Sequence, residues 1–163
     1  MIWTALALVP ALVAPAPPET AVAAALDAWH AAAARADEAA YFDLFAEEGV
    51  FLGTDATERW DKAAFRAFAH PFFAKGRAWT FRAVRRQVAM AAGGTVAYFD
   101  EDLETANLGP CRGSGVLELR GGAWRLLQYN LAVPIPNDLM KEVMGRIGDH
   151  LRKQAPPAPA ASR

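Results

Sequence analysis

Three acidic residues, Asp100, Glu101 and Asp102, follow one another in an otherwise apolar stretch. In a β-strand, alternation places Asp100 and Asp102 on one face and Glu101 on the other. If one face lines a pocket, burial there would raise the pKa of a carboxyl group and suit it to act as a general base or acid. Asp100 and Glu101 are therefore the candidate catalytic residues. The alternatives are a solvated sheet edge or pairing with Arg112, and the pattern does not decide which face points inward.

The next strand-like segment combines a cation with small residues. Arg112 and Ser114 share one face, and Gly113 and Gly115 share the other. An arginine at a pocket floor can bind a carboxylate or hold a neighbouring acid in place, so Arg112 is a candidate ligand-binding residue. The glycines favour a bend of the sheet or a close approach of another part of the chain. The alternative is that the segment serves only a bulge and bend required by the fold.

The composition excludes several classes of function. The chain has 163 residues and a formal net charge of −1, so no basic surface indicates nucleic-acid binding. Its single cysteine excludes an intrachain disulfide and a cysteine-rich metal cluster. The histidines lack the spacing of a metal site, and His30 and His70 are expected at surface or helix-packing positions. No phosphate-binding loop is present, so we predict no metal, nucleotide or flavin cofactor.

Apolar residues at helical spacing predict three helices in the first half of the chain and one at its end. The first covers 19–35. The second is capped by Asp37 and stops at Gly49, and the third is capped by Asp61. Asn137 can cap the last helix.

The segments between these helices predict strands. A short strand is expected at 50–53, and longer strands are expected at 79–90, 95–104, 111–119 and 123–133. Strands joined by short turns form an antiparallel meander, so the fold class is α+β, with N-terminal helices packed on a strongly curved antiparallel sheet and a C-terminal helix. A sheet wrapped around a helix leaves a concave mouth, where ligand pockets tend to lie.

The two ends of the chain differ in composition from the rest. Residues 1–16 hold an apolar run followed by a small-residue site, which predicts a secretory signal peptide and a periplasmic or secreted protein. The run is too short to span a membrane, and no lipid-anchor cysteine follows it, so no stable membrane anchor is expected. Residues 153–163 are rich in Pro and Ala and predict a disordered tail. One domain is expected at 19–152.

An ordered set of segments carries a resemblance to a known family. The stretch ADEAAYFDLF is followed by EGVFLGTDATERW, FRAFAHPFF and GRAWTF, and then by YFDEDL, CRGSGVLEL, GGAWRLLQYNL and PIPNDL. Over about residues 19–145 the chain resembles the SnoaL-like branch of the nuclear transport factor 2-like superfamily. The resemblance implies a cystatin-like α+β cone with an internal pocket, often as a homodimer. Relatives include ketosteroid isomerases, polyketide cyclases, dehydratases and binding modules, so the fold does not choose a chemistry.

The resemblance also bears on the stretch FLGTDATERW, which spans 51–60. In the family this segment crosses near the mouth of the cone, which implies that Trp60 forms a pocket wall and that Asp55 or Thr57 meets a ligand. The alternative is that Asp55 caps its own turn through the backbone and that Trp60 belongs to the core. Asp55 and Trp60 are both candidate ligand-binding residues.

Alternation on the last strand groups Trp124, Leu126, Gln128 and Asn130 on one face. Many relatives carry His near the positions of Gln128 and Asn130. Amides there can hold a ligand or an oxyanion but transfer protons poorly, which disfavours catalysis by histidine. If this face is inward, the opposite face is the one that the family often uses for dimer contacts. Gln128 and Asn130, together with Tyr98, complete the candidate ligand-binding set.

Three hypotheses for the function follow. The first is an exported SnoaL-like protein that binds a small hydrophobic molecule in its pocket. The alternative is an isomerase-, cyclase- or dehydratase-type enzyme that uses a pocket carboxylate as general base on a carbonyl compound. The third is an interaction module whose homodimer or tail matters more than its pocket.

Overall fold

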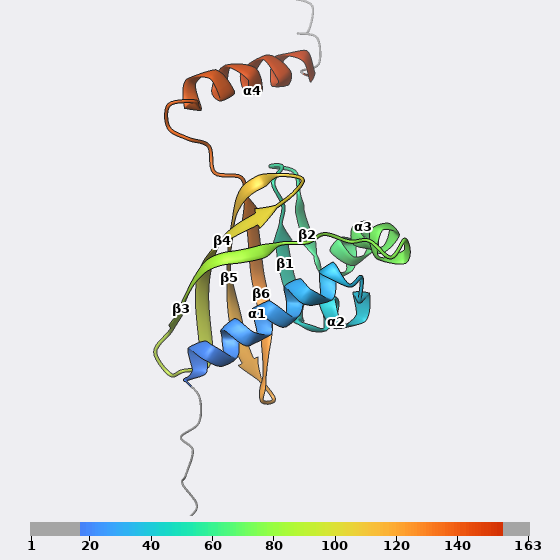
Figure 1. Ribbon diagram of the computed structural model, residues 1–163, viewed down its shortest axis with the longest axis vertical. Helices are drawn as coiled ribbons and strands as arrows, with labels where there is room; N and C mark the ends of the chain where they lie inside the picture. Colours follow the sequence, from blue (N-terminus) through green and yellow to red (C-terminus); the bar gives the residue numbers. More distant parts are fainter. Residues whose placement is uncertain (1–16, 155–163) are drawn as a thin grey trace, which may run out of the picture. The chain divides into compact units, whose positions relative to one another are not determined.

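The computed structural model describes residues 17–154 and divides the chain after Ala132 into two compact units. The first unit holds a sheet with three helices, and the second holds one helix (Figure 1). Residues 1–16 and 155–163 lie outside the described residues. The predicted signal peptide and most of the predicted tail fall there, so both stay predictions.

The helices of the first unit are α1 (Pro18–Ala34), α2 (Glu38–Asp43) and α3 (Lys62–Ala74). The Asp37 side chain accepts a hydrogen bond from the backbone N–H of Ala40 at 3.0 Å, at the start of α2. Asp61 accepts one from the N–H of Ala64 at 2.8 Å, at the start of α3. Such bonds satisfy N–H groups that a helix start leaves unpaired, and they confirm both predicted caps.

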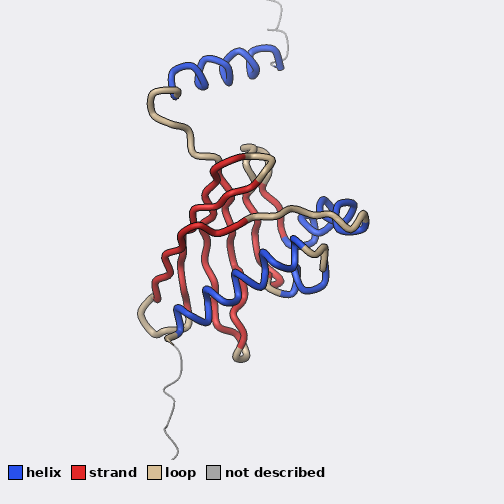
Figure 2. Tube along the Cα trace, viewed as in Figure 1, coloured by secondary structure: helices blue, strands red, loops and turns tan. Residues whose placement is uncertain are grey.

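The described residues form a sheet of the strands β1 (Phe45–Leu52), β2 (Arg59–Asp61), β3 (Arg82–Met90), β4 (Val96–Thr105), β5 (Gly109–Arg120) and β6 (Ala123–Ala132). Their order is β2-β1-β6-β5-β4-β3, and neighbours are antiparallel except β1 and β6, which are parallel. The sheet curves around α1 without closing (Figures 1 and 2). The predicted α+β class is confirmed, although the parallel pair was not predicted.

The core lies between α1 and the inner face of the sheet. Helix α1 buries Val22, Leu26 and Trp29, and the inner face of β4 contributes Phe99 and Leu103. Each fully buried side chain of this kind contributes about 1.5–3 kcal/mol to folding. A polar group on the same inner face is therefore enclosed as well and requires a partner.

The first strand begins earlier than predicted. Phe45 lies opposite Leu126 of β6, so α2 ends at Asp43 and does not continue to Gly49. Gly49 lies in an irregular part of this pairing, before Val50. A Cβ atom on Gly49 would lie 2.8 Å from the carbonyl oxygen of Leu126, so glycine permits the close approach of the two backbones.

A bulge in β6 changes which of its side chains face inward. Val116 of β5 lies opposite Gln128, but the following residue, Leu117, lies opposite Leu126, so Leu127 is an extra residue in β6. After such a bulge the alternation of side chains moves by one residue. Strict alternation along this strand therefore fails.

The consequence is that Tyr129 and Leu131 are buried on the inner face, on the same side as Leu126. Gln128 and Asn130 lie on the outer face, where Gln128 is exposed and Asn130 is half-buried. The prediction that Leu126, Gln128 and Asn130 share one face is wrong, because it assumed an unbroken strand.

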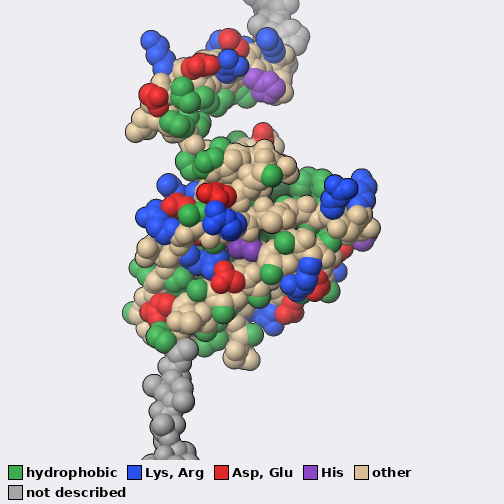
Figure 3. Space-filling view, viewed as in Figure 1, with side chains coloured by type: hydrophobic (Ala, Val, Ile, Leu, Met, Phe, Trp, Pro, Cys, Tyr) green, Lys and Arg blue, Asp and Glu red, His purple; other side chains and the backbone are tan. Residues whose placement is uncertain are grey.

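The second unit contains α4 (Met140–Gln154), so the predicted C-terminal helix is present and extends two residues beyond the expected domain end. Its apolar residues Met144, Ile147 and Leu151 are exposed, and charged side chains lie beside them (Figure 3). No helix within residues 17–154 has the length and apolar character needed to cross a membrane.

Candidate functional site

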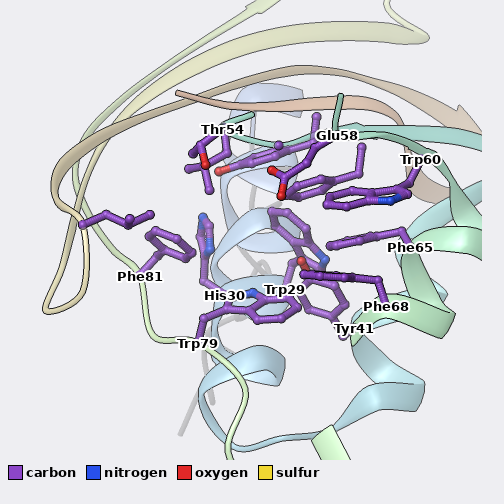
Figure 4. Close-up of a pocket in the computed structure, with 15 residues that line it drawn as sticks. Trp29, His30, Tyr41, Thr54, Glu58, Trp60, Phe65, Phe68, Trp79 and Phe81 are labelled. Carbon is purple, nitrogen blue, oxygen red and sulfur yellow. The ribbon is translucent and has the colours of Figure 1, made fainter. Parts of the chain in front are cut away.

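A cavity of about 230 Å³ lies between the helices and the inner face of the sheet in the first unit. Of its 15 lining residues, nine are Phe, Tyr or Trp, so its wall is mainly aromatic. Figure 4 shows these rings converging from α1, α3 and the sheet on one space. Polar groups in the lining include the side chains of His30, Thr54 and Glu58 and the hydroxyls of Tyr41 and Tyr129.

One wall of the cavity is a stack of rings from β2 and α3. The ring of Trp60 lies 5.7 Å from that of Phe65 and 4.7 Å from that of Phe68, at angles of 16° and 20°. Phe51 stacks on the other side of Phe65 at 4.0 Å. Because α3 begins directly after β2, the cap at Asp61 fixes the position of Trp60 relative to both phenylalanines. Trp60 thus lies in the cavity wall, and its part in ligand binding stays a prediction.

The inner face of β4 carries one acid next to the cavity. Glu101 is only 1% exposed, and its Oε1 atom lies 2.8 Å from Nε2 of His30 and 3.1 Å from the hydroxyl of Tyr129, which donates to it. His30 and Tyr129 both line the cavity. Glu101 therefore does not line the cavity itself, but it is hydrogen-bonded to two residues that do.

The other oxygen of Glu101 is bound from the opposite side. Arg86 of β3 places Nε 2.8 Å from Oε2 of Glu101. Its Nη1 atom donates to Oδ1 of Asp27 at 2.7 Å and to the carbonyl oxygen of Ala23 at 3.0 Å. The side chain of Arg86 is 9% exposed, so this is a largely buried ion pair in which both partners are hydrogen-bonded.

These contacts determine the ionisation of the cluster. Burial by itself raises the pKa of a carboxyl group, but the hydrogen bond and charge of His30, together with the charge of Arg86, outweigh it and lower the pKa of Glu101. The expectation that an inward acid has a raised pKa is wrong for this reason. Burial and the adjacent charge of Glu101 raise the pKa of the Tyr129 hydroxyl. At neutral pH, Glu101 is an acceptor and Tyr129 a donor.

The hydrogen bond to Glu101 also determines how His30 is oriented. An ionised carboxylate only accepts hydrogen bonds, so Nε2 of His30 carries the hydrogen. In a neutral imidazole, Nδ1 is then left with a free lone pair. Within residues 17–154 no group is hydrogen-bonded to Nδ1. In its neutral form, the histidine thus presents a proton acceptor to a mainly aromatic cavity, with a carboxylate behind it.

Gly113 of β5 provides the space that this cluster requires. It faces inward opposite Glu101, and a Cβ atom there would lie 2.3 Å from the Tyr129 hydroxyl and 2.8 Å from Oε1 of Glu101. Any side chain would displace one of these groups. The close approach predicted for the glycines of this strand therefore serves the polar cluster.

The turn between β1 and β2 holds a second carboxylate at the cavity. Asp55 accepts hydrogen bonds through Oδ1 from the N–H of Thr57 at 2.8 Å and from its hydroxyl at 2.6 Å, which is the turn-capping alternative. The N–H of Asp55 donates to Oε2 of Glu58 at 3.2 Å. Glu58, rather than the exposed Asp55, lines the cavity.

Five of the eight predicted site residues lie together on the outer face of the sheet, away from the cavity. Tyr98, Asp100 and Arg112 are exposed there, and Tyr98 and Asp100 are in register with Gln128 and Asn130 across β5. The Nε atom of Arg112 lies 3.9 Å from Oδ1 of Asp102. Pairing of Arg112 with an acid of the neighbouring strand was the alternative to a ligand-binding role. Of the predicted residues, Trp60 lines the cavity, and Glu101 contacts residues that line it.

His30, Glu58 and Tyr129 offer polar groups at the cavity but were not among the predicted site residues, although the sequence contains a signal for the first two. His30 follows Val22 and Leu26 at intervals of four, so helical spacing puts it on the buried face of α1. Glu58 precedes Trp60 by two positions, the spacing that puts two side chains on one side of a strand. Tyr129 left none, because its inward direction depends on the bulge in β6.

Within the described residues, no three side chains of His, Cys, Asp or Glu are grouped so that they could hold a metal ion. Glu101 pairs with Arg86 behind the lining, whereas Glu58, which lines the cavity, accepts a hydrogen bond from the N–H of Asp55. The residues that line the cavity can form hydrogen bonds, exchange protons, attract a positive charge and contact a ligand through aromatic rings.

The fold and the cavity agree with a comparison of the sequence with known families. The family model of the SnoaL-like domain matches residues 22–136, which is most of the chain. The chain belongs to the SnoaL-like domain family. The resemblance inferred from the segments at 36–45 and beyond is therefore confirmed. No curated protein matches this chain.

Solved structures support the same fold. A protein with a cystatin-like fold from Nostoc punctiforme matches with a TM-score of 0.58 at 13% identity, over 71% of this chain and 90% of that chain. A candidate ketosteroid isomerase from Parabacteroides distasonis matches with a TM-score of 0.57 at 13% identity, over 71% and 86%. A candidate dehydratase of the NTF2-like family from Streptomyces avermitilis matches with a TM-score of 0.59 at 15% identity, over 72% and 96%. Such similarity concerns the fold alone.

Proposed function

We propose that this SnoaL-like chain binds a small, largely apolar molecule in the aromatic cavity. The observation that carries the proposal is a cavity of about 230 Å³ whose lining is mainly aromatic and includes a few polar groups. Ligand sites in proteins commonly combine these features. An engineered apolar cavity of about 150 Å³ binds benzene, so the volume suits a ligand somewhat larger than one aromatic ring.

Two phenylalanines of α3 provide a matched test. Phe68 and Phe72 are each 45% exposed, but only Phe68 lines the cavity. With acetophenone as the probe, we expect Phe68→Ala to weaken binding about tenfold, which corresponds to about 1.4 kcal/mol of lost contact, and Phe72→Ala to leave it unchanged. Native mass spectrometry and fluorescence of the cavity tryptophans would measure both. No binding by the wild-type chain, or equal losses in both variants, would contradict the proposal.

A second function, acid–base catalysis, is favoured by the contact between His30 and Glu101. His30 would abstract a proton from the carbon next to a carbonyl group, and Glu101 would act as a positioning residue that stabilises the imidazolium formed. The Tyr129 hydroxyl lies beside the same carboxylate and lines the cavity. The similarity to a candidate isomerase and a candidate dehydratase supports this choice of chemistry only at the level of the fold.

The test is hydrogen–deuterium exchange at the methyl group of acetophenone, followed by NMR. We expect the wild-type chain to accelerate exchange and His30→Gln to lose at least about a hundredfold of that acceleration. His70→Gln is the control, because His70 is an exposed histidine that pairs with Glu38 on the helical side of the molecule. Equal exchange with His30→Gln and the wild-type chain would exclude this role.

We also propose a homodimer formed through the outer face of the sheet. Tyr98 is 56% exposed there, and it lies in register with Val116 and Gln128 on the neighbouring strands. A large exposed ring on the outer face suits a contact between copies. Light scattering should report a dimer for the wild-type chain and a monomer for Tyr98→Asp, while Thr57→Asp in the β1–β2 turn stays dimeric. A monomeric wild-type chain would contradict the proposal.

A further inference from the structure

The charged side chain that lines the cavity, and would contact a ligand, is negative. Among the described residues that line it there is no lysine and no arginine, whereas Glu58 contributes a carboxylate. Arg86, the guanidinium of the polar cluster, is bound to Glu101 and Asp27, so with His30 neutral the cluster carries one net negative charge. The local field therefore favours a positive ligand group over a negative or neutral one.

Glu58 is held in position by the backbone of its turn. The N–H of Gly53 donates to the carbonyl oxygen of Glu58 at 2.9 Å, and the N–H of Asp55 donates to its Oε2 atom at 3.2 Å. A Cβ atom on Gly53 would lie 2.1 Å from the same Oε2 atom, so the carboxylate rests directly over the glycine. Its other oxygen, Oε1, has no hydrogen-bond partner within residues 17–154.

The aromatic wall next to Glu58 has the same electrostatic preference. Trp60, Phe65 and Phe68 stack with nearly parallel planes. The face of an aromatic ring carries negative charge density and attracts an organic cation, most strongly in the case of tryptophan. Figure 4 shows Glu58 and Trp60 on the same side of the cavity. A carboxylate and several ring faces around one space form the arrangement that proteins use to bind alkylammonium groups.

We propose that the ligand of this cavity is an organic cation, an alkylammonium group attached to an apolar body. The ammonium group lies between Glu58 and the ring of Trp60, and the apolar body fills the rest of the aromatic cavity. This inference rests on the proposed binding function and specifies the ligand class. It assigns to Glu58 the role of counter-ion, and to Gly53 the role of leaving room for the carboxylate.

The test compares two ligands of nearly identical shape, phenyltrimethylammonium and tert-butylbenzene, which differ in the charge of the central atom. Tryptophan fluorescence of the full chain would measure both affinities. We expect the cation to bind at least tenfold more tightly than the neutral compound. We expect Glu58→Gln to remove most of this preference, because it weakens binding of the cation only. Glu47→Gln is the control and should leave the preference unchanged, because Glu47 is 90% exposed and lies outside the cavity.

Gly53→Ala provides a second variant that keeps the carboxylate but displaces it. This variant should weaken binding of the cation several-fold and change binding of the neutral compound little. If the neutral compound binds as tightly as the cation and Phe68→Ala weakens it, the cation inference fails and the binding function stands. If neither compound binds to the wild-type chain, both proposals fail. If Glu58→Gln weakens both compounds equally, Glu58 is not a counter-ion and the inference is overturned.

Discussion

Two neighbouring arginines of β3 form ion pairs with two neighbouring acids of β4, on opposite faces of the sheet. On the outer face Arg85 and Asp102 approach to 2.7 Å, with 62% and 39% of their side chains exposed. On the inner face Arg86 and Glu101 approach to 2.8 Å, with 9% and 0% exposed. The chemistry and distances are almost the same, but only the inner pair is removed from water. Burial, rather than geometry, therefore decides which pair matters for stability and which lies at the site.

Removing one arginine at a time tests this contrast most directly. Arg86→Met leaves Glu101 buried without its guanidinium partner, and we expect a loss of about 3–5 kcal/mol in the free energy of unfolding. Arg85→Met should cost less than about 1 kcal/mol, because the exposed pair is screened by water. Urea unfolding followed by circular dichroism would measure both variants. Similar losses in the two variants would show that burial is not the deciding factor.

A methyl group on β5 tests the inner face without changing any charge. Gly113→Ala would place a Cβ atom 2.3 Å from the Tyr129 hydroxyl, so the contacts around Glu101 must shift. We expect a loss of about 1–3 kcal/mol, as is typical of overpacking. Ser114→Ala, at the next position and on the outer face, should change stability by no more than about 0.5 kcal/mol. Thermal unfolding of both variants decides whether the inner face is the more tightly constrained one.

The pH dependence of stability gives the smallest effect. The pKa of Glu101 in the folded chain lies below its ordinary value of 4.5, so its stabilising contribution is complete above about pH 4.5 and is lost as the pH falls through the folded pKa. The difference in unfolding free energy between the wild-type chain and Glu101→Gln should therefore be constant near neutral pH and shrink in acid. Asp100→Asn, on the outer face, should differ from the wild-type chain by less than about 0.5 kcal/mol throughout. A difference for Glu101→Gln that grows in acid would contradict the assigned direction of the pKa shift.

The sequence indicated the order of the elements well, because local patterns carry that information. The caps at Asp37 and Asp61 and the alternation of β4 depend on residues that are close in sequence. The position of α2 and β1 was less predictable, since Phe45 joins the sheet only through its pairing with Leu126, which is distant in the chain. For the site, alternation along β4 put Glu101 on the face opposite Asp100 and Asp102. It did not show which of the two faces points into the core.

By itself, then, the sequence determined the family, the helix caps and the two faces of β4, since each follows from the types and spacing of nearby residues. The tertiary structure decided which face became the site. The bulge at Leu127 turned Tyr129 inward, and packing of α1 on the sheet placed His30 against Glu101, 71 positions away in the chain. The physical reason is that burial and pairing are properties of the assembled core. Local spacing places a side chain on a face, and packing decides what that face meets.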